Sequence, residues 1–136
     1  MPRYIALVDG KAGAYGVVVP DLPGCTAMGR TTDEALCNAV DAARMWAEDA
    51  RAQGEALPKP RPIETLRQDR EVARAIVEGA ALAVVPLILD AARPAKANLS
   101  LDAGLLAAID EAADAHGLTR SAFIASAARE KIAKDA

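Results

Sequence analysis

The sequence predicts an α+β fold made of two units, and three patterns along the chain support this prediction. The first part has short β-prone stretches separated by turns, and a long pattern of helical period follows them. The last third begins with alternating polar and apolar residues and then changes to helical spacing. A proline-containing stretch separates the two parts, so we expect domains at residues 1–90 and 96–136 joined by a linker at residues 91–95.

The composition is that of an ordinary globular protein. With 136 residues, of which 52% are hydrophobic and 26% charged, the chain has room for one or two small domains. The longest apolar run, residues 80–89, contains Pro86 and is too short to span a membrane. Asp9 follows the N-terminus too soon for a signal peptide. We therefore expect a cytoplasmic protein with no membrane partner.

The N-terminal part predicts a three-stranded meander. Residues 4–8 and 15–19 are β-prone and flank a glycine-containing turn at residues 9–13, which is typical of an antiparallel hairpin. Two prolines in residues 20–24 exclude a continued central strand, so we expect a short third strand at residues 25–28.

A long helix should follow the meander. Thr31 and Glu34 form a capping-box pattern, and the apolar stripe behind them ends near Gly54. Trp46 lies on that stripe, where a core position is favoured over the alternative of an exposed anchor for a partner.

The rest of the first domain predicts a connector, helix and strand. The three prolines of residues 57–62 indicate a stiff extended connector. Residues 63–78 favour one helix or two short ones ending at Gly79. Residues 81–89 are so apolar that we expect a strand buried on both faces, paired with the first hairpin.

The last third begins with a predicted half-buried strand, residues 96–101. Its polar face carries Lys96, Asn98 and Ser100, and its apolar face carries Ala97, Leu99 and Leu101. A lone strand has no sheet to join, so we expect two chains to pair these strands antiparallel about a two-fold axis. The polar face would then form a two-stranded ribbon that fits the DNA major groove.

Two helices are predicted after this strand. Asp102 should cap the first helix and Gly117 should end it, and Thr119 should cap the second. The apolar face of the first helix carries Leu105, Ile109, Ala112 and Ala113, and that of the second carries Phe123, Ile124, Ala127, Ala128 and Ile132.

With its Gly-Leu-Thr-Arg-Ser turn at residues 117–121, the segment 96–133 resembles the ribbon-helix-helix family of bacterial repressors. Asn98 is suited to adenine, Lys96 to guanine or phosphate, and Ser100 to either. A phosphate would fit the start of the second helix, where Thr119, Arg120 and Ser121 lie. The alternative is that the polar face is only a solvated strand surface.

A second resemblance covers most of residues 4–60. Its motifs are residues 15–25, residues 32–39 and residues 57–60, which are similar to the HicB antitoxin family. The resemblance implies a partial ribonuclease-H-like first domain that binds and blocks a HicA-type toxin, an RNA-cleaving protein with a double-stranded-RNA-binding-like fold. It also implies that the second domain, as a dimer or tetramer, represses the toxin–antitoxin operon by binding operator DNA. An orphan regulator with no toxin is an alternative.

A metal-dependent nuclease of the ribonuclease H type is the other alternative, and it needs three or four converging carboxylates. The candidates are Asp9, Asp21, Asp33, Glu34 and Asp41. We favour solvated or capping roles for them, because the first two fall in predicted turns and the next two in a first helical turn. We therefore expect no catalytic residue, metal or cofactor.

Three further side chains have favoured structural roles. His116, the only histidine, ends a predicted helix, where its ring can meet free carbonyl groups. Cys25 and Cys37 belong to no metal-binding spacing, so buried or half-buried thiols are favoured over a metal site or disulfide.

The charge is divided unequally along the chain. Residues 1–90 contain ten basic and thirteen acidic residues, and residues 91–136 contain six of each. The whole net charge of −3 therefore comes from residues 1–90. An acidic first domain is suited to a basic, RNA-binding partner.

Overall fold

The computed structural model describes residues 1–89 and 95–136. The chain divides into two compact units, one built on residues 1–89 and one that lies within residues 95–132. All but the last residue of the predicted linker, residues 91–95, lies outside the described residues.

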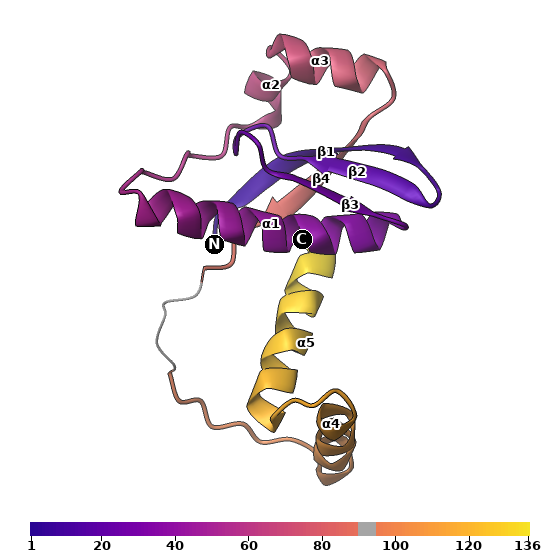
Figure 1. The fold of residues 1–136 in the computed structure, drawn as a ribbon, viewed down its shortest axis with the longest axis vertical. Coiled ribbons are helices and arrows are strands. Elements are labelled where there is room, and N and C mark those ends of the chain that lie inside the picture. The colour runs from indigo at the N-terminus through magenta and orange to yellow at the C-terminus, as the bar shows by residue number, and fades with distance from the viewer. Residues whose placement is uncertain (90–94) are drawn as a thin grey trace. The chain divides into compact units, whose positions relative to one another are not determined.

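The first unit is built around a four-stranded antiparallel sheet (Figure 1). Strands β1 (Arg3–Lys11), β2 (Ala14–Val18) and β3 (Thr26–Gly29) form the predicted meander. Strand β4 (Ala81–Pro86) returns to the other side of β1, which gives the order β3-β2-β1-β4. The α+β class and the pairing of the last strand with the first hairpin are therefore confirmed.

The first hairpin is longer than predicted, and its turn begins later. Asp9, Gly10 and Lys11 belong to β1 and pair with β2, so the prediction of a turn from residue 9 was wrong. Gly10 has a φ of +98°, and a Cβ at this position would run into the carbonyl group of Ala14. Glycine thus allows the ladder to continue to the short turn at residues 12–13.

Helix α1 (Thr32–Ala52) covers one face of the sheet, and its start is the predicted one. The Oγ1 atom of Thr31 accepts a hydrogen bond from the N–H of Glu34 at 3.1 Å. The helix packs into the apolar core on this face of the sheet through small side chains, namely Ala35, Ala39, Ala43 and Ala47. Neither α1 nor any other helix of the described residues is long and apolar enough to cross a membrane.

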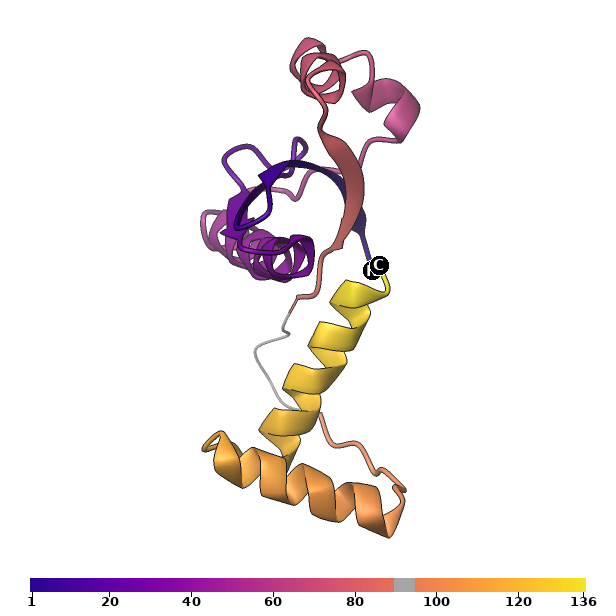
Figure 2. The ribbon, with the colours of Figure 1, turned by 90° about the vertical axis from the view of Figure 1, so that its right-hand side faces the viewer.

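The opposite face of the sheet is partly covered by α2 (Ile63–Leu66) and α3 (Arg70–Val77), so the alternative of two short helices is the correct one. Figures 1 and 2 show the sheet between α1 and this pair of helices. Leu66 and Val72 pack on Leu7 of β1 and form a second, smaller apolar cluster. The connector before α2 has no helix or strand, and Pro62 at its end has extended backbone angles, in line with the prediction.

Strand β4 is not buried on both faces, and this prediction was wrong. Leu82 is 39% exposed and Val84 is 37% exposed, whereas only the last two residues of the strand are buried. The reason is its position, because β4 lies at the edge of the sheet with β1 as its only neighbour. An apolar run of this length does not distinguish a central strand from an edge strand.

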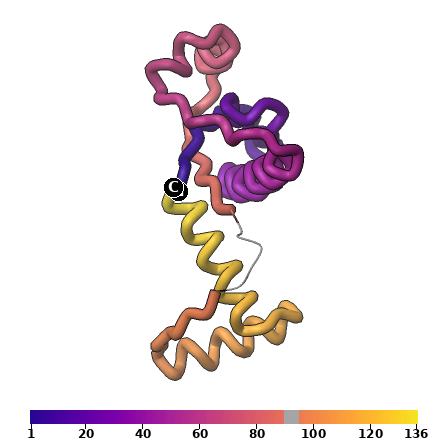
Figure 3. The backbone as a smooth tube through the Cα atoms, turned by 90° about the vertical axis from the view of Figure 1, so that its left-hand side faces the viewer, coloured from indigo at the N-terminus to yellow at the C-terminus, as the bar shows by residue number. Residues whose placement is uncertain are grey.

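The second unit contains α4 (Ala103–Ala115) and most of α5 (Arg120–Lys134), which Figure 3 shows as a backbone trace. The carboxylate of Asp102 accepts hydrogen bonds from the N–H groups of Gly104 and Leu105 at 2.9 and 3.2 Å. Gly117, with a φ of +67°, follows the end of α4. The Oγ1 atom of Thr119 accepts a hydrogen bond from the N–H of Ala122 at 3.1 Å, so every predicted cap is confirmed.

Residues 95–102 have no regular secondary structure, so the strand predicted at residues 96–101 does not form within one chain. A strand is stabilised by a hydrogen-bonded neighbour, and the described residues supply none to this segment.

Candidate functional site

The three predicted base contacts lie on the segment that precedes α4, and all of them are exposed. Lys96, Asn98 and Ser100 are open to solvent. The apolar residues between them are exposed as well, with Leu99 at 62% and Leu101 at 38%. The alternation of polar and apolar residues therefore does not correspond to one exposed and one buried face in a single chain.

The apolar faces of both helices are also incompletely covered. Leu105 is 50% exposed and Ile132 is 38% exposed, and Ala113 is the one residue of α4 that is buried. No residue of α5 is buried. The predicted buried faces are therefore open in one chain, because one segment and two helices cannot enclose a core.

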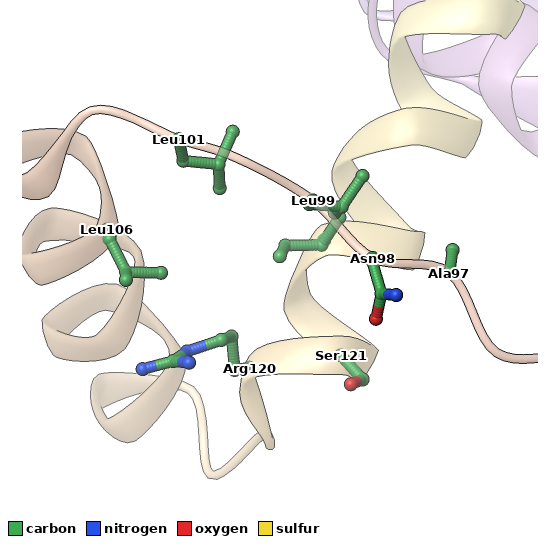
Figure 4. A pocket seen from close by; sticks show the side chains of 8 residues that line it. Ala97, Asn98, Leu99, Leu101, Leu106, Arg120 and Ser121 are labelled. Atoms are coloured by element: carbon green, nitrogen blue, oxygen red, sulfur yellow. The ribbon is translucent and has the colours of Figure 1, made fainter.

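A concave surface brings some of the predicted contact residues together (Figure 4). The segment before α4 lies over the two helices and borders an open pocket of about 280 Å³. Asn98 lines this pocket together with Arg120 and Ser121 at the start of α5. One predicted base contact thus lies beside two predicted phosphate contacts. The remaining lining residues are apolar, namely Ala97, Leu99, Leu101, Leu106 and Ile124.

Arg120 already has a partner in the chain. Its Nε and Nη2 atoms donate hydrogen bonds to the two carboxylate oxygens of Asp110, each at 2.8 Å. The hydrogen bond from Arg120 lowers the pKa of Asp110, and the same bond raises the pKa of Arg120. Any phosphate at this position must therefore share the guanidinium group with Asp110 or displace it.

The remaining predicted residues of the helix ends have local partners. The Nδ1 atom of His116 lies 2.8 Å from the carbonyl oxygen of Ala112, which confirms the predicted role at the end of α4. Thr119 is engaged as the cap of α5.

The carboxylates of the first unit do not converge. Within residues 1–89 and 95–136, no three His, Cys, Asp or Glu side chains lie close enough together to hold a metal ion. Asp33 and Glu34 lie in the first turn of α1, as predicted. Asp9 lies on β1 and is exposed.

Asp21 is buried rather than solvated, so the prediction for this residue was wrong. It is 8% exposed, and its carboxylate accepts hydrogen bonds from the Nε atom of Arg61 at 2.6 Å and from the backbone N–H of Arg61 at 2.8 Å. The extended connector runs back to the turn after β2, and Arg61 neutralises the carboxylate there. The two residues are 40 positions apart, so no local pattern indicated their contact.

A second contact anchors the same connector. The hydroxyl group of Tyr4, which is 1% exposed, donates a hydrogen bond to the carbonyl oxygen of Pro58 at 2.6 Å. Burial raises the pKa of Tyr4, and the negative charge of Asp21 raises it further.

Trp46 and the cysteines have structural positions. Trp46 is half-buried against the core, and its Nε1 atom donates a hydrogen bond to the carbonyl oxygen of Pro23 at 2.9 Å. Cys25 is buried, which raises the pKa of its thiol, and Cys37 is half-buried, as predicted.

A groove of about 250 Å³ lies on the sheet face beside α3, and sequence reasoning missed it. Its walls come from β1, from β2 and from the start of α3. Hydrophobic periodicity indicates which residues are apolar, but not which part of a sheet face a helix leaves open.

Comparison with known proteins decides the family. A family model described as HicB-like antitoxin of bacterial toxin–antitoxin systems matches residues 4–128, which is most of both units. The chain belongs to this family. It is therefore an antitoxin and not an enzyme, since the members of this family are not enzymes.

Several relatives of this HicB-like antitoxin match over nearly the whole chain. An uncharacterised 14.9 kDa protein of Haemophilus phage HP1 is 32% identical over 131 residues, which are 95% of this chain and 96% of the phage protein. The crystal structure of the antitoxin HicB from Burkholderia pseudomallei is 32% identical, has a TM-score of 0.56, and matches 96% of this chain and 98% of its own. The crystal structure of the antitoxin HicB3 is 28% identical, with a TM-score of 0.55, and the match covers 96% of this chain and 97% of that chain.

One chain of a solved toxin–antitoxin complex is also similar to this chain. One chain of a HicA3 and HicB3 toxin–antitoxin complex is 25% identical, with a TM-score of 0.52, and the match covers 65% of this chain and 98% of that chain.

Proposed function

We propose that residues 1–90 of this HicB-like antitoxin bind and block a HicA-type toxin that cleaves mRNA, and that residues 96–136 repress the operon by binding operator DNA. In this proposal the first domain is a partial ribonuclease-H-like fold and the second is a ribbon-helix-helix unit. The linker at residues 91–95 joins them. The assembly is a dimer through residues 96–101, with a tetramer as the alternative.

One observation carries the DNA-binding half of the proposal, namely the exposure of apolar side chains in the second unit. Leu99, Leu101 and Leu105 are 62%, 38% and 50% exposed in one chain. Burying apolar surface is favourable by about 25 cal/mol per Å², so these residues favour association with a second copy of the same segment. Antiparallel pairing about a two-fold axis would bury them and leave Lys96, Asn98 and Ser100 on the outer face.

The proposed DNA contacts follow from the chemistry of these side chains. Asn98 pairs with adenine, Lys96 with guanine or phosphate, and Ser100 with either, in the major groove. Thr119, Arg120 and Ser121, beside the N-terminus of α5, would hold a phosphate and position the dimer without specifying sequence.

Asn98→Ala tests the base contact. We expect operator affinity to fall by ~1–3 kcal/mol while the dimer stays intact, because in the proposed dimer the side chain faces outward and one amide–adenine pair is lost. Operator titration by fluorescence anisotropy, with a scrambled duplex as the control for non-specific binding, measures the change. An unchanged affinity and footprint would reject the role of Asn98.

The toxin half is supported by family membership and by the resemblance to a chain of the HicA3 and HicB3 complex. The acidic balance of residues 1–90 is suited to a partner that binds RNA. The test is to mix the purified chain with the short protein encoded beside its gene. We expect a stable complex on gel filtration and loss of the RNA cleavage of that protein, and the absence of both would overturn this half.

A further inference from the structure

Part of one sheet face in the first unit is not covered by any helix of the described chain. On this outer face, Leu7 and Asp9 of β1 lie beside Val18 and Gly16 of β2 in the antiparallel register. Helix α3 covers Leu7, which is 8% exposed, but Val18 is 44% exposed. Gly16 has no side chain, so the carboxylate of Asp9 lies over open backbone. The uncovered region of this face therefore lies beside α3, from Leu7 of β1 toward Val18 of β2.

The groove of about 250 Å³ lies at this boundary. Its apolar lining includes Leu7, Val18 and Val72. Every charged residue that lines it is acidic, namely Asp9, Asp69 and Glu71. The groove thus combines an apolar lining with carboxylates, and no cation of the described residues lines it.

Two of these carboxylates are available to a partner. Asp69 caps α3 by accepting hydrogen bonds from the N–H groups of Glu71 and Val72, and it lies 3.8 Å from Arg61. Asp9 and Glu71, in contrast, are exposed, and neither forms an ion pair within the described chain. Two like charges at one groove favour a cation between them.

We propose that this groove is the docking surface for the toxin and that it holds a lysine or arginine side chain of the toxin between Asp9 and Glu71. This inference depends on the proposed function, in which the partner cleaves RNA. An RNA-cleaving protein needs cationic side chains for the phosphate backbone. Lysine and arginine also have long aliphatic stems, which pack on apolar surface while the charged end reaches a polar group.

This docking mode includes a way to block the toxin. A toxin cation held by Asp9 and Glu71 is no longer available to an RNA phosphate, so the antitoxin carboxylates compete directly with the substrate. Because the contact is charge-assisted and lies near solvent, its strength depends on ionic strength.

The test compares two double variants of the full-length chain. Asp9→Asn with Glu71→Gln removes the two carboxylates of the groove. Asp41→Asn with Glu55→Gln removes two exposed carboxylates on and just after α1, which covers the opposite face of the sheet. The net charge changes equally in both double variants. Binding to the protein encoded beside the gene is measured by calorimetry at low and at physiological salt.

We expect the groove variant to bind roughly tenfold to hundredfold more weakly at low salt and to lose most of its salt dependence. The control variant should stay within about twofold of the unchanged protein. Val18→Lys is a second probe, since it places a cation at the groove on an exposed side chain. It should weaken binding at least as much, with thermal unfolding used to confirm that the variant is folded.

The outcomes separate this inference from the function on which it depends. If the unchanged chain does not bind the neighbouring protein, the toxin-binding function fails, and the docking surface fails with it. If the unchanged chain binds but the groove and control variants behave alike, toxin binding stands and the groove is not the surface. If the groove variants instead change the oligomeric state of the antitoxin alone, the occupant is a second copy of this chain and the inference is overturned.

Discussion

Asp21 is the buried carboxylate that fixes the path of the chain after α1. Its contacts with the side chain and backbone of Arg61 satisfy both carboxylate oxygens, and Arg61 also approaches Asp69 before α3. This contact therefore acts together with the Tyr4–Pro58 hydrogen bond and the packing of Leu66 and Val72 on Leu7 to hold α3 and one wall of the groove in place. Asp is frequent in turns for local reasons, so the sequence around this residue did not indicate burial.

Asp21→Asn should lower the free energy of unfolding by about 1–3 kcal/mol, because an amide replaces a carboxylate that accepts charge-assisted hydrogen bonds. Urea denaturation at neutral pH measures the difference. Asp41→Asn, at an exposed position of α1, is the matched control and should change stability by less than about 0.5 kcal/mol. Equal effects of the two substitutions would contradict the anchoring role of Asp21.

The ion pair between Asp110 and Arg120 should make the stability of the fold depend on pH. The hydrogen bond from Arg120 lowers its pKa in the folded protein, so the ion pair stabilises the fold above the unfolded pKa of about 3.9. This stabilisation is lost as the pH falls through the lowered, folded pKa. The melting temperature of the unchanged protein should therefore exceed that of Asp110→Asn at neutral pH, and the gap should close in strong acid. A gap that is constant with pH would show that the charge of Asp110 is not its source.

Individual helices were predicted well where a capping side chain marks their start. The starts of α1, α4 and α5 follow from capping side chains that bond to backbone groups two or three residues away. Burial was predicted less well, and β4 is the example. Its residues are apolar, yet Leu82 and Val84 are exposed because the strand lies at the sheet edge.

The cap of α1 can be tested directly. Thr31→Ala should cost about 1 kcal/mol of stability, since the N–H of Glu34 loses its acceptor. Thr32→Ala, one position later and inside the helix, removes the same atoms without removing a cap and serves as the control. Chemical denaturation of both variants gives the comparison, and a loss no larger for Thr31 than for Thr32 would exclude a capping contribution.

For the whole molecule, the proposed activities occupy separate units, so a variant should be able to lose one and keep the other. Leu99→Asp places a charge among the apolar residues that a second chain would cover, and an unpaired buried charge opposes association strongly. We expect this variant to be a monomer by light scattering and to lose operator binding, yet to form a complex with the toxin.

Asn98→Ala is the matched comparison, because it should weaken operator binding while remaining a dimer. If Leu99→Asp stays dimeric, or if it loses the toxin as well, the assignment of dimerisation to residues 96–101 and of toxin binding to the first domain would need revision.

Local sequence signals predicted the α+β class, the helix caps, the antiparallel pairing of the first two strands and the family. These follow from periodicity, from side chains that act within a few residues, and from motifs that are continuous along the chain. The burial of Asp21, the exposure of the edge strand β4 and the acidic groove beside α3 were visible only in the folded chain. Each of these depends on which distant segments meet, as Asp21 and Arg61 do across 40 positions, and local patterns contain no information about such meetings.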